Sequence, residues 1–125
     1  MSPSPYAIRV KRIYDPVDQD DGARVLVDRL WPRGMTRERA ALTRHLPEVA
    51  PSADLRRWYG HDQDRFGAFA RRYHDELASE PEAAAALRIL LDLAAQGRLT
   101  LLTATRDLDR SHAQILLDHL SQEGR

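Results

Sequence analysis

The first part of the chain alternates apolar and charged residues. In the segment Tyr6–Tyr14 (YAIRVKRIY), isoleucine and valine alternate with arginine and lysine, which is the period-2 pattern of a half-buried strand. The next segment, Asp15–Ala23 (DPVDQDDGA), is polar and contains a proline and a glycine, so it is predicted to be a loop. Residues 1–5 (MSPSP) are predicted to be a frayed leader.

A short, continuous apolar run occurs in the second predicted strand. Val25–Val27 lies within a strand predicted at Arg24–Leu30, and a third strand is predicted at Leu99–Thr103 (LTLLT). Such runs are typical of strands that are buried on both faces, as in a parallel sheet covered by helices. The pairing of the first two strands stays open, because the loop between them is short for a helical crossover.

Helices are predicted between and after these strands, mainly in the middle of the chain. Helical spacing and helix-start signals indicate a short helix from Thr36, then Ser52–Tyr59, Asp64–Leu77, a helix from the capping box Ser79-x-x-Glu82 to Gly97, and a last helix capped by Ser111. This order predicts an α/β fold, with a small, mainly parallel sheet flanked by helices and a helix-rich middle section. The length of 125 residues predicts one domain over 1–125.

Charge is balanced overall but not along the chain. There are 19 basic and 19 acidic residues, and every basic residue except Lys11 is an arginine. Residues 1–60 hold 11 basic and 8 acidic side chains, whereas residues 61–125 hold 8 and 11. Zero net charge disfavours a strongly basic nucleic-acid binder and an acidic chaperone-like chain.

Several classes of protein are excluded by residues that are missing. The chain has no cysteine, so thiolate catalysis, cysteine-ligated metals and disulfides are ruled out. His61, His74 and His112 match no known metal-ligand spacing, and no metal site is predicted. There is no secretory signal pattern and no apolar run near the length of about 18 residues that a membrane helix needs. A cytoplasmic protein without a membrane segment is therefore expected.

Polar residues follow two of the predicted strands, where an open α/β sheet binds its ligands. One group is Asp28–Gly34 (DRLWPRG), and the other begins after Thr103 and reaches the start of the last helix. Arginine forms bidentate bonds to carboxylates and phosphates, and a helix N-terminus attracts anions. The candidate proton carriers are Asp28 and His112, and the candidate ligand contacts are Arg29, Trp31, Arg33, Gly34, His61 and Arg106.

Each candidate also has a structural interpretation that the sequence leaves open. Asp28 fits an internal partner for an arginine or a loop amide as well as a catalytic base. Trp31 fits a hydrophobic lid over the core as well as a stacking surface. His112 fits an ordinary first residue of a helix, and His119, on the apolar face of the last helix, is predicted to be a core histidine.

Six motifs follow one another in an order that is typical of one bacterial family. They are KRIYD (Lys11–Asp15), DGARVLVDRLWPRG (Asp21–Gly34), APSADLRRWYGHD (Ala50–Asp62), RYHDEL (Arg72–Leu77), LTLL (Leu99–Leu102) and SHAQIL (Ser111–Leu116). Over almost its whole length the chain resembles the domain-of-unknown-function 488 family, in its short YeaO-like branch. The resemblance implies a small cytosolic α/β fold and no particular activity. It adds Arg57 and Tyr73 to the candidate ligand contacts.

The chain departs from that family pattern at a few positions. Members usually have Trp-Leu-Lys where this chain has His45–Pro47, and asparagine where it has Ser111. The missing lysine removes one anion contact. Longer relatives carry cysteines near the third strand, where this chain has Thr103 and Thr105, so the resemblance implies no thiolate chemistry here.

Three functions remain open from the sequence. The first is a site that binds, and in one version also acts on, a small anionic molecule, with Asp28 or His112 as the proton carrier. The second is nucleotide or nucleic-acid binding, with Trp31, Trp58 and Tyr59 available for stacking. The third is a regulatory protein whose tryptophan-bearing surface binds a partner. The sequence identifies no cofactor, and it is compatible with a homo-oligomer.

Overall fold

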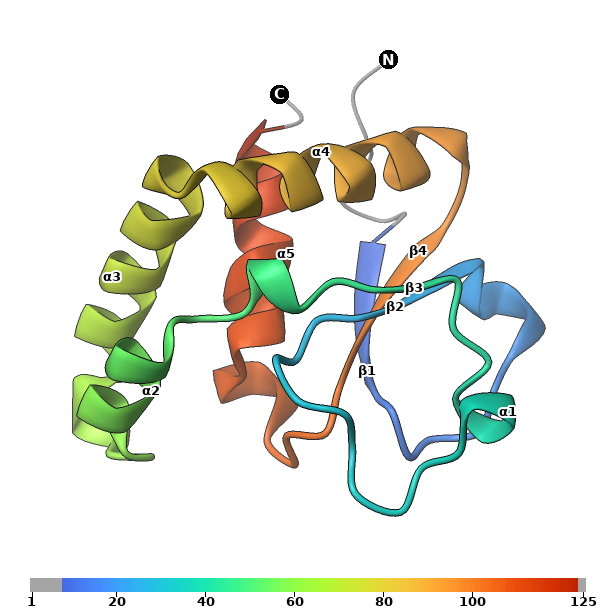
Figure 1. The fold of residues 1–125 in the computed structure, drawn as a ribbon, viewed down its shortest axis with the longest axis horizontal. Helices are drawn as coiled ribbons and strands as arrows, with labels where there is room; N and C mark the ends of the chain where they lie inside the picture. Colours follow the sequence, from blue (N-terminus) through green and yellow to red (C-terminus); the bar gives the residue numbers. More distant parts are fainter. Residues whose placement is uncertain (1–7, 124–125) are drawn as a thin grey trace.

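The computed structural model describes residues 8–123 and contains a parallel β-sheet (Figure 1). The strands of the described residues are β1 (Ile8–Arg12), β2 (Ala23–Leu26), β3 (Arg44–His45) and β4 (Leu99–Thr103), in the spatial order β1-β4-β2-β3. Each neighbouring pair is parallel, which confirms the predicted small parallel sheet. The predicted leader, residues 1–5, lies outside the described residues.

Helices make up most of the chain between β2 and β4. The α-helices of the described residues are α1 (Arg37–Ala40), α2 (Ala53–Tyr59), α3 (Phe66–Ser79), α4 (Pro81–Gln96) and α5 (His112–Glu123). Short 3-10 turns lie at Gln19–Asp21, Pro47–Val49, Gln63–Arg65 and Leu108–Arg110. The α/β fold with a helix-rich middle section is thereby confirmed. Among residues 8–123, no helix has both the length and the apolar character needed to cross a membrane.

The order of the strands explains how a short loop joins β1 to β2. β4 lies between them, so that Leu101 is level with Val10 on one side and with Val25 on the other. β1 and β2 are therefore parallel without being neighbours. Residues 13–22 connect them across β4 with a 3-10 turn in place of a helix, and the hydroxyl of Thr100 on β4 donates to the carbonyl of Asp21 at 2.7 Å.

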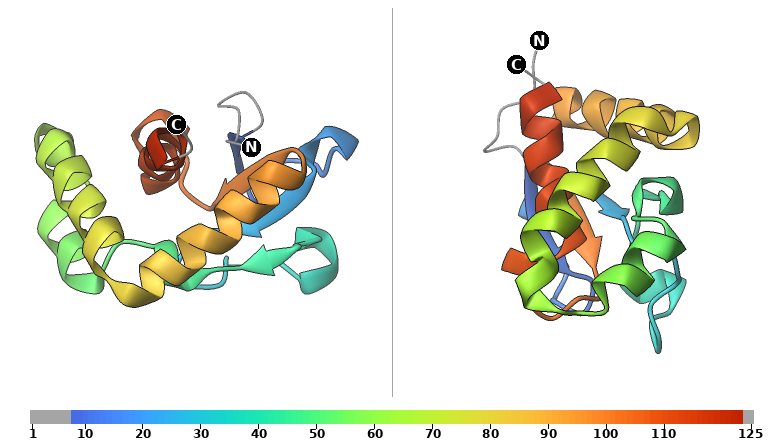
Figure 2. Two further views of the ribbon diagram at one scale, coloured as in Figure 1. Left: turned by 90° about the horizontal axis from the view of Figure 1, so that it is seen from above. Right: turned by 90° about the vertical axis from the view of Figure 1, so that its left-hand side faces the viewer.

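One face of the sheet carries the main hydrophobic core. Because side chains alternate along a strand, every second residue points to this face. α5 lies against the sheet, α3 lies beyond α5, and α4 crosses at the end of the sheet where β1 begins (Figures 1 and 2). The buried side chains that meet here include Ile8, Val25, Val27, Leu99 and Leu101 from the strand segments, with Tyr73, Leu90, Leu116 and Leu120 from the helices.

The other face of the sheet is covered by loops and by α1. A small apolar cluster gathers at its carboxyl half and contains Ile13, Leu26, Met35, Ala40 and Leu102. The remaining part of this face is polar, because Arg9 and Lys11 on β1 point to it. The two faces therefore differ in chemistry as well as in what covers them.

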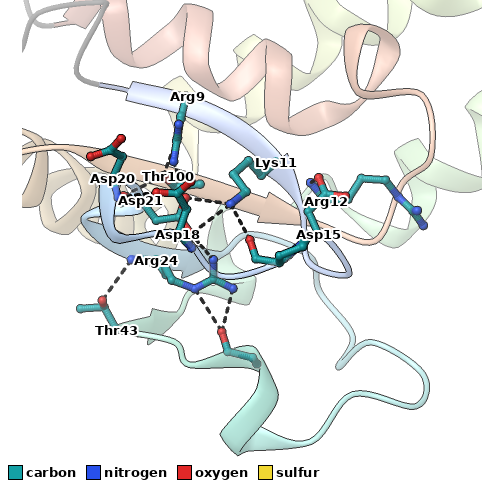
Figure 3. A network of polar contacts seen from close by, with 12 residues as sticks. Arg9, Lys11, Arg12, Asp15, Asp18, Asp20, Asp21, Arg24, Thr43 and Thr100 are labelled. Atoms are coloured by element: carbon teal, nitrogen blue, oxygen red, sulfur yellow. Dashed lines mark hydrogen bonds and ion pairs between the residues drawn. The ribbon is translucent and has the colours of Figure 1, made fainter.

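A buried carboxylate occupies the polar part of this second face (Figure 3). Asp21 is only 1% exposed and pairs with Arg9, with Lys11 at 2.8 Å, and with Arg24. These four residues are called the Asp21 cluster below. Burial by itself would raise the pKa of Asp21, but hydrogen bonds from Lys11, from the Asp18 amide and from the two arginines hold that pKa well below its ordinary value.

Gly22 lets the connection lie close to the start of β4. Its φ of 63° falls in the left-handed region, and a Cβ atom at this position would lie 2.2 Å from the carbonyl oxygen of Arg98. That same oxygen accepts a hydrogen bond from the amide of Ala23 at 2.9 Å. Only glycine satisfies both conditions, and the close approach holds Asp21 over the sheet.

The predicted capping box at Ser79 is wrong. Ser79 is the last residue of α3, and its hydroxyl donates to the carbonyl of Asp75 at 2.8 Å. Glu80 is the N-cap of α4, makes no side-chain cap bond, and is followed by Pro81. α3 continues through the predicted cap because its buried face extends to Leu77, and Pro81, which lacks an amide hydrogen, suits the first position of the next helix.

Candidate functional site

A pocket of about 730 Å³ opens at the carboxyl ends of β2 and β4. Its walls come from the segment after β2, the segment after β4, the start of α5, and α2 with the turn that follows it. This is the edge of the sheet where the sequence predicts a ligand site. The predicted site residues that line it are Asp28, Arg29, Trp31, Arg33, Arg57, His61 and His112.

Asp28 connects the segments that form the floor of this pocket. Its carboxylate accepts a hydrogen bond from the amide of Ala104, just after β4, at 2.8 Å. Its other carboxylate oxygen lies 3.2 Å from Nε2 of His112 at the start of α5. Its main-chain carbonyl lies 2.8 Å from Nε2 of His45 on β3. Asp28 thus serves as an internal partner, which is one of the two roles that the sequence leaves open.

The same contacts explain why β2 ends earlier than predicted. The sheet ladder continues as far as the amide of Val27, which donates to Leu102 at 3.1 Å. Beyond that point the carbonyls of Val27 and Asp28 face imidazole nitrogens, of His112 at 3.0 Å and of His45 at 2.8 Å. Side chains therefore replace a neighbouring strand as hydrogen-bond partners, and the chain is free to turn into the pocket wall.

The electrostatics of the floor fix the charge of Asp28 and the tautomer of His112. Burial would raise the pKa of Asp28, but His112, the Ala104 amide and the Thr103 hydroxyl hold that pKa below its ordinary value. Asp28 is therefore ionised at neutral pH. Because the Val27 carbonyl and the Asp28 carboxylate only accept hydrogen bonds, Nε2 of His112 carries the proton. Nδ1 is then the ring nitrogen that can accept a proton.

Arginine is the most frequent charged residue in the pocket wall. The lining arginines are Arg29, Arg33, Arg56, Arg57 and Arg110. Arg29 donates to the carbonyls of Ala50 and Pro51 at 3.3 and 3.2 Å, so its guanidinium is held in place without a carboxylate. Arg110 donates to the side-chain oxygen of Gln63 at 2.6 Å, and Arg57 pairs with the exposed Asp54.

Two half-exposed aromatic residues line the pocket. The indole nitrogen of Trp31 donates to the carbonyl of Met35 at 2.7 Å. The hydroxyl of Tyr14 donates to the carbonyl of Arg33 at 2.8 Å. Both rings line the pocket, and both are anchored by main-chain bonds of the segment that follows β2.

α2 and the turn after it contribute Arg56, Arg57 and His61 to the pocket wall, and a cap residue fixes each end of the helix. The Ser52 hydroxyl accepts from the amide of Leu55 at 3.1 Å and donates to the carboxylate of Glu76 on α3. The helix ends at Gly60 with φ 54°, and His61 follows with φ 61°. This left-handed turn exposes His61 toward the pocket, as the sequence predicts.

Three of the predicted ligand contacts do not line the pocket. Tyr73 is fully buried, its hydroxyl donates to the carbonyl of Val49, and its ring stands edge-on to His112 at 6.1 Å. Tyr73 therefore packs against His112 from the core and makes no contact with a ligand in the pocket. Gly34 has φ 74° in the turn beyond Pro32, and Arg106 is exposed outside the lining.

A family model described as the inactive DUF488-N3 subclade matches residues 7–125. The chain belongs to this subclade. It is 44% identical to the uncharacterized protein Rv3073c of Mycobacterium tuberculosis (strain ATCC 25618 / H37Rv), over 91% of this chain and 93% of that protein. It is also 38% identical to the uncharacterized protein YeaO of Escherichia coli (strain K12), over 90% of this chain and 96% of that protein. No solved structure matches the chain. The resemblance noted in the sequence is confirmed.

The histidines of this DUF488 chain serve separate contacts. Nδ1 of His74 on α3 lies 2.8 Å from Nδ1 of His119 on α5, and the two rings are stacked. His119 is buried on the apolar face of α5, as the sequence predicts. His112 faces Val27 and Asp28, and His61 lies in the turn after α2. Among the described residues no group of three such side chains is placed to hold a metal ion.

Sequence reasoning missed Arg56, Arg110 and Tyr14 in the wall of the DUF488 pocket. Signals for two of them were available. Tyr14 follows β1, so it lies at the same edge of the parallel sheet as the residues after β2 and β4. Arg110 directly precedes Ser111, whose hydroxyl accepts from the amide of Gln114 at 3.2 Å and caps α5. For Arg56 no signal was available beyond its position next to Arg57.

Proposed function

We propose that the pocket binds a small anionic molecule without transforming it. The observation that carries the proposal is the excess of cationic side chains in one cavity of about 730 Å³. Five arginines line it, against the two carboxylates of Asp28 and Asp107. Guanidinium groups bind carboxylates and phosphates through paired hydrogen bonds, so this wall favours an anion.

The fixed parts of the site add to this preference. Arg29 is held by two main-chain carbonyls, so a ligand that binds it has little side-chain entropy to remove. Ser111 and His112 place the start of α5 in the wall, and the amides of a first helical turn favour negative charge.

Three observations favour binding over catalysis. The carboxylate of Asp28 is ionised and already accepts from Ala104, and the Nε2 proton of His112 is directed at Val27 and Asp28. The chain has no cysteine, so no thiolate can attack a bound ligand. The description of the subclade as inactive supports the same conclusion.

Titration calorimetry with inorganic phosphate and pyrophosphate tests the proposal. We expect the protein to bind at least one of them, and Arg33→Ala to bind it about tenfold more weakly, because one charge-assisted contact is lost. Arg88→Ala is the matched control, since Arg88 is an exposed arginine of α4 outside the pocket. Equal affinity of Arg33→Ala and the unaltered protein, or no binding of either anion, would refute the proposal.

A second function, recognition of a protein partner, is favoured by one observation. Leu30 is 70% exposed and is adjacent in the chain to the half-exposed Trp31, and both line the pocket. Exposed apolar residues that adjoin one another, rather than single ones, mark interaction surfaces. Leu30→Ser distinguishes the two functions, because it removes apolar contact area and leaves all five arginines in place. Unchanged anion affinity in this variant would assign Leu30 to a function other than the ligand pocket.

A further inference from the structure

We infer that the anion bound here carries a flat ring, and that nucleoside phosphates are the ligand class of the pocket. The inference rests on the proposed anion-binding function and specifies its ligand. It is carried by the way the aromatic residues of the wall are bonded. Its experiments separate the recognition of a ring from the recognition of an anion.

Two half-exposed rings of the wall come from other segments than most of its cations. Tyr14 follows β1 and Trp31 follows β2, whereas Arg56 and Arg57 belong to α2 and Arg110 to the turn before α5. In Figure 1, α2 lies at the lower left and α1 at the lower right, and the segment after β2 descends between these two helices. Arg29 and Arg33 lie in the same segment as Trp31, so the pocket offers a ligand aromatic surface with positive charge both beside it and on α2.

The polar atoms of both rings are already used inside the protein. Nε1 of Trp31 donates to Met35, and the hydroxyl of Tyr14 donates to Arg33. Neither ring has a hydrogen left to donate to a sugar hydroxyl or a carboxylate. What each ring still offers is the exposed part of its π surface, since an arginine lies over each ring. The natural partner of an exposed π surface is another flat ring.

An arginine also holds each ring. The guanidinium carbon of Arg37 lies 5.6 Å from the centre of the Trp31 ring, and that of Arg12 lies 5.2 Å from the centre of the Tyr14 ring. Each residue nevertheless remains 38% exposed. A ring fixed in this way stacks on a ligand with little loss of side-chain entropy. A cavity of about 730 Å³ also lies within the size range of small-molecule pockets, roughly 300–1,000 Å³.

Fluorescence of Trp31 tests the stacking directly. The chain has two tryptophans, and Trp58 lies outside the pocket, beside the guanidinium groups of Arg65 and Arg72 at 5.1 and 4.1 Å. In Trp58→Phe, Trp31 is the remaining tryptophan, and we expect AMP and GMP to quench it while ribose 5-phosphate does not. The matched control is Trp31→Phe, in which Trp58 reports and no quenching is expected.

Calorimetry gives the energetic counterpart. We expect AMP to bind about tenfold more tightly than ribose 5-phosphate, because one stacked base adds this much. In Trp31→Leu, which keeps apolar bulk without a π surface, we expect this preference to fall to within about twofold while the affinity for ribose 5-phosphate is kept. Circular dichroism confirms that the variant is folded, and the Trp58→Phe experiment does not depend on Trp31→Leu.

The outcomes separate the two levels of the proposal. If ribose 5-phosphate binds as tightly as AMP and the fluorescence of Trp31 is not quenched, the inference that the ligand carries a ring is overturned. The proposal that the pocket binds an anion is then unaffected. If ribose 5-phosphate, inorganic phosphate and pyrophosphate all fail to bind, the proposed function fails as well. If a single-stranded oligonucleotide binds a hundredfold more tightly than AMP, the ligand is a nucleic acid and the inference is overturned.

Discussion

The Asp21 cluster and the pocket are both rich in arginine, yet they use it in opposite ways. In the Asp21 cluster, three cations surround one carboxylate that is 1% exposed, and Arg24 also donates to the carbonyl of Ala40 at 2.9 Å. In the pocket, Arg29 donates only to main-chain carbonyls, and Arg57 pairs with an acid that is itself exposed. The first arrangement fixes a loop on the sheet, and the second presents charge to a ligand.

The difference lies in burial and partners rather than in residue type. Removing a buried charge leaves its former partners buried and unpaired, which is costly, whereas removing an exposed charge returns its partners to water. The two regions should therefore respond oppositely to substitution. Changes in the Asp21 cluster should affect folding, and changes of the pocket arginines should affect binding.

The largest effect is expected at the centre of the Asp21 cluster. Asp21→Asn should lower the free energy of unfolding by about 3–5 kcal/mol, because Arg24 then keeps a buried charge without its carboxylate. The measurement is urea denaturation at pH 7. The control is Asp20→Asn, a neighbouring exposed acid, for which a change within about 0.5 kcal/mol is expected. Equal losses in the two variants would contradict a structural role for the cluster.

A second test compares two glycines with similar positive φ angles. Gly22→Ala should lose about 2–4 kcal/mol, since strain at φ 63° adds to a collision with the Arg98 carbonyl. Gly34→Ala should lose only about 1 kcal/mol, because the space around Gly34 is open and only the strain at φ 74° remains. Thermal denaturation of both variants measures the difference. A Gly34 loss as large as the Gly22 loss would show that contact with Arg98 is unimportant.

Asp28 is both a partly buried hydrogen-bond partner and a lining residue of the pocket, so its substitution is expected to affect stability and binding together. Asp28→Asn should lower stability by about 1–3 kcal/mol, because the charged partner of His112 and of the Ala104 amide is lost. The same substitution removes a negative charge from the pocket wall, so phosphate should bind more tightly. Urea denaturation and calorimetry on one preparation give both values. Weaker phosphate binding would show that Asp28 positions a cation that the ligand needs.

The smallest effect expected is a difference in acid sensitivity. The pKa of Asp28 is lowered in the folded protein, so its contribution is fully present above the unfolded pKa of about 3.9 and is lost as pH falls through the lower folded value. Between pH 5 and pH 3 the unaltered protein should therefore lose more stability than Asp28→Asn. Denaturation midpoints across this range measure the difference, and parallel pH profiles would contradict it.

The fold could be predicted from the sequence where apolar runs determine it. Val25–Val27 is buried as expected, since continuous apolar residues have to avoid water on both faces. The third predicted strand, Leu99–Thr103, is also buried, and it includes the polar residues Thr100 and Thr103. β3 was not predictable in this way. It consists of Arg44 and His45, and its pairing depends on where the chain returns after α1 rather than on apolar residues of its own.

The location of the candidate site could be predicted from the sequence, but the full set of residues that line it could not. Arg29 and Arg33 follow β2 and line the pocket, whereas Arg106, chosen on the same argument after β4, lies outside it. The direction of a side chain within a turn depends on the path of the whole segment, which local patterns do not encode. The alternation of Arg9 and Lys11 with apolar residues predicts one polar strand face, which the structure confirms, but nothing local indicates that Asp21 covers that face.

The position of β4 has a consequence for how the protein is made. β4 is the last strand to be synthesised, yet it is the strand that β1 and β2 both require as a neighbour. Before it emerges from the ribosome, β1 and β2 cannot complete the sheet, and α5, which covers the same face, follows later still. Formation of the sheet therefore waits until residues 99–103 have been translated. A chain that stops before Leu99 leaves β1 without a neighbouring strand and β2 with β3 alone, so apolar strand residues stay exposed, as in aggregation-prone folding intermediates.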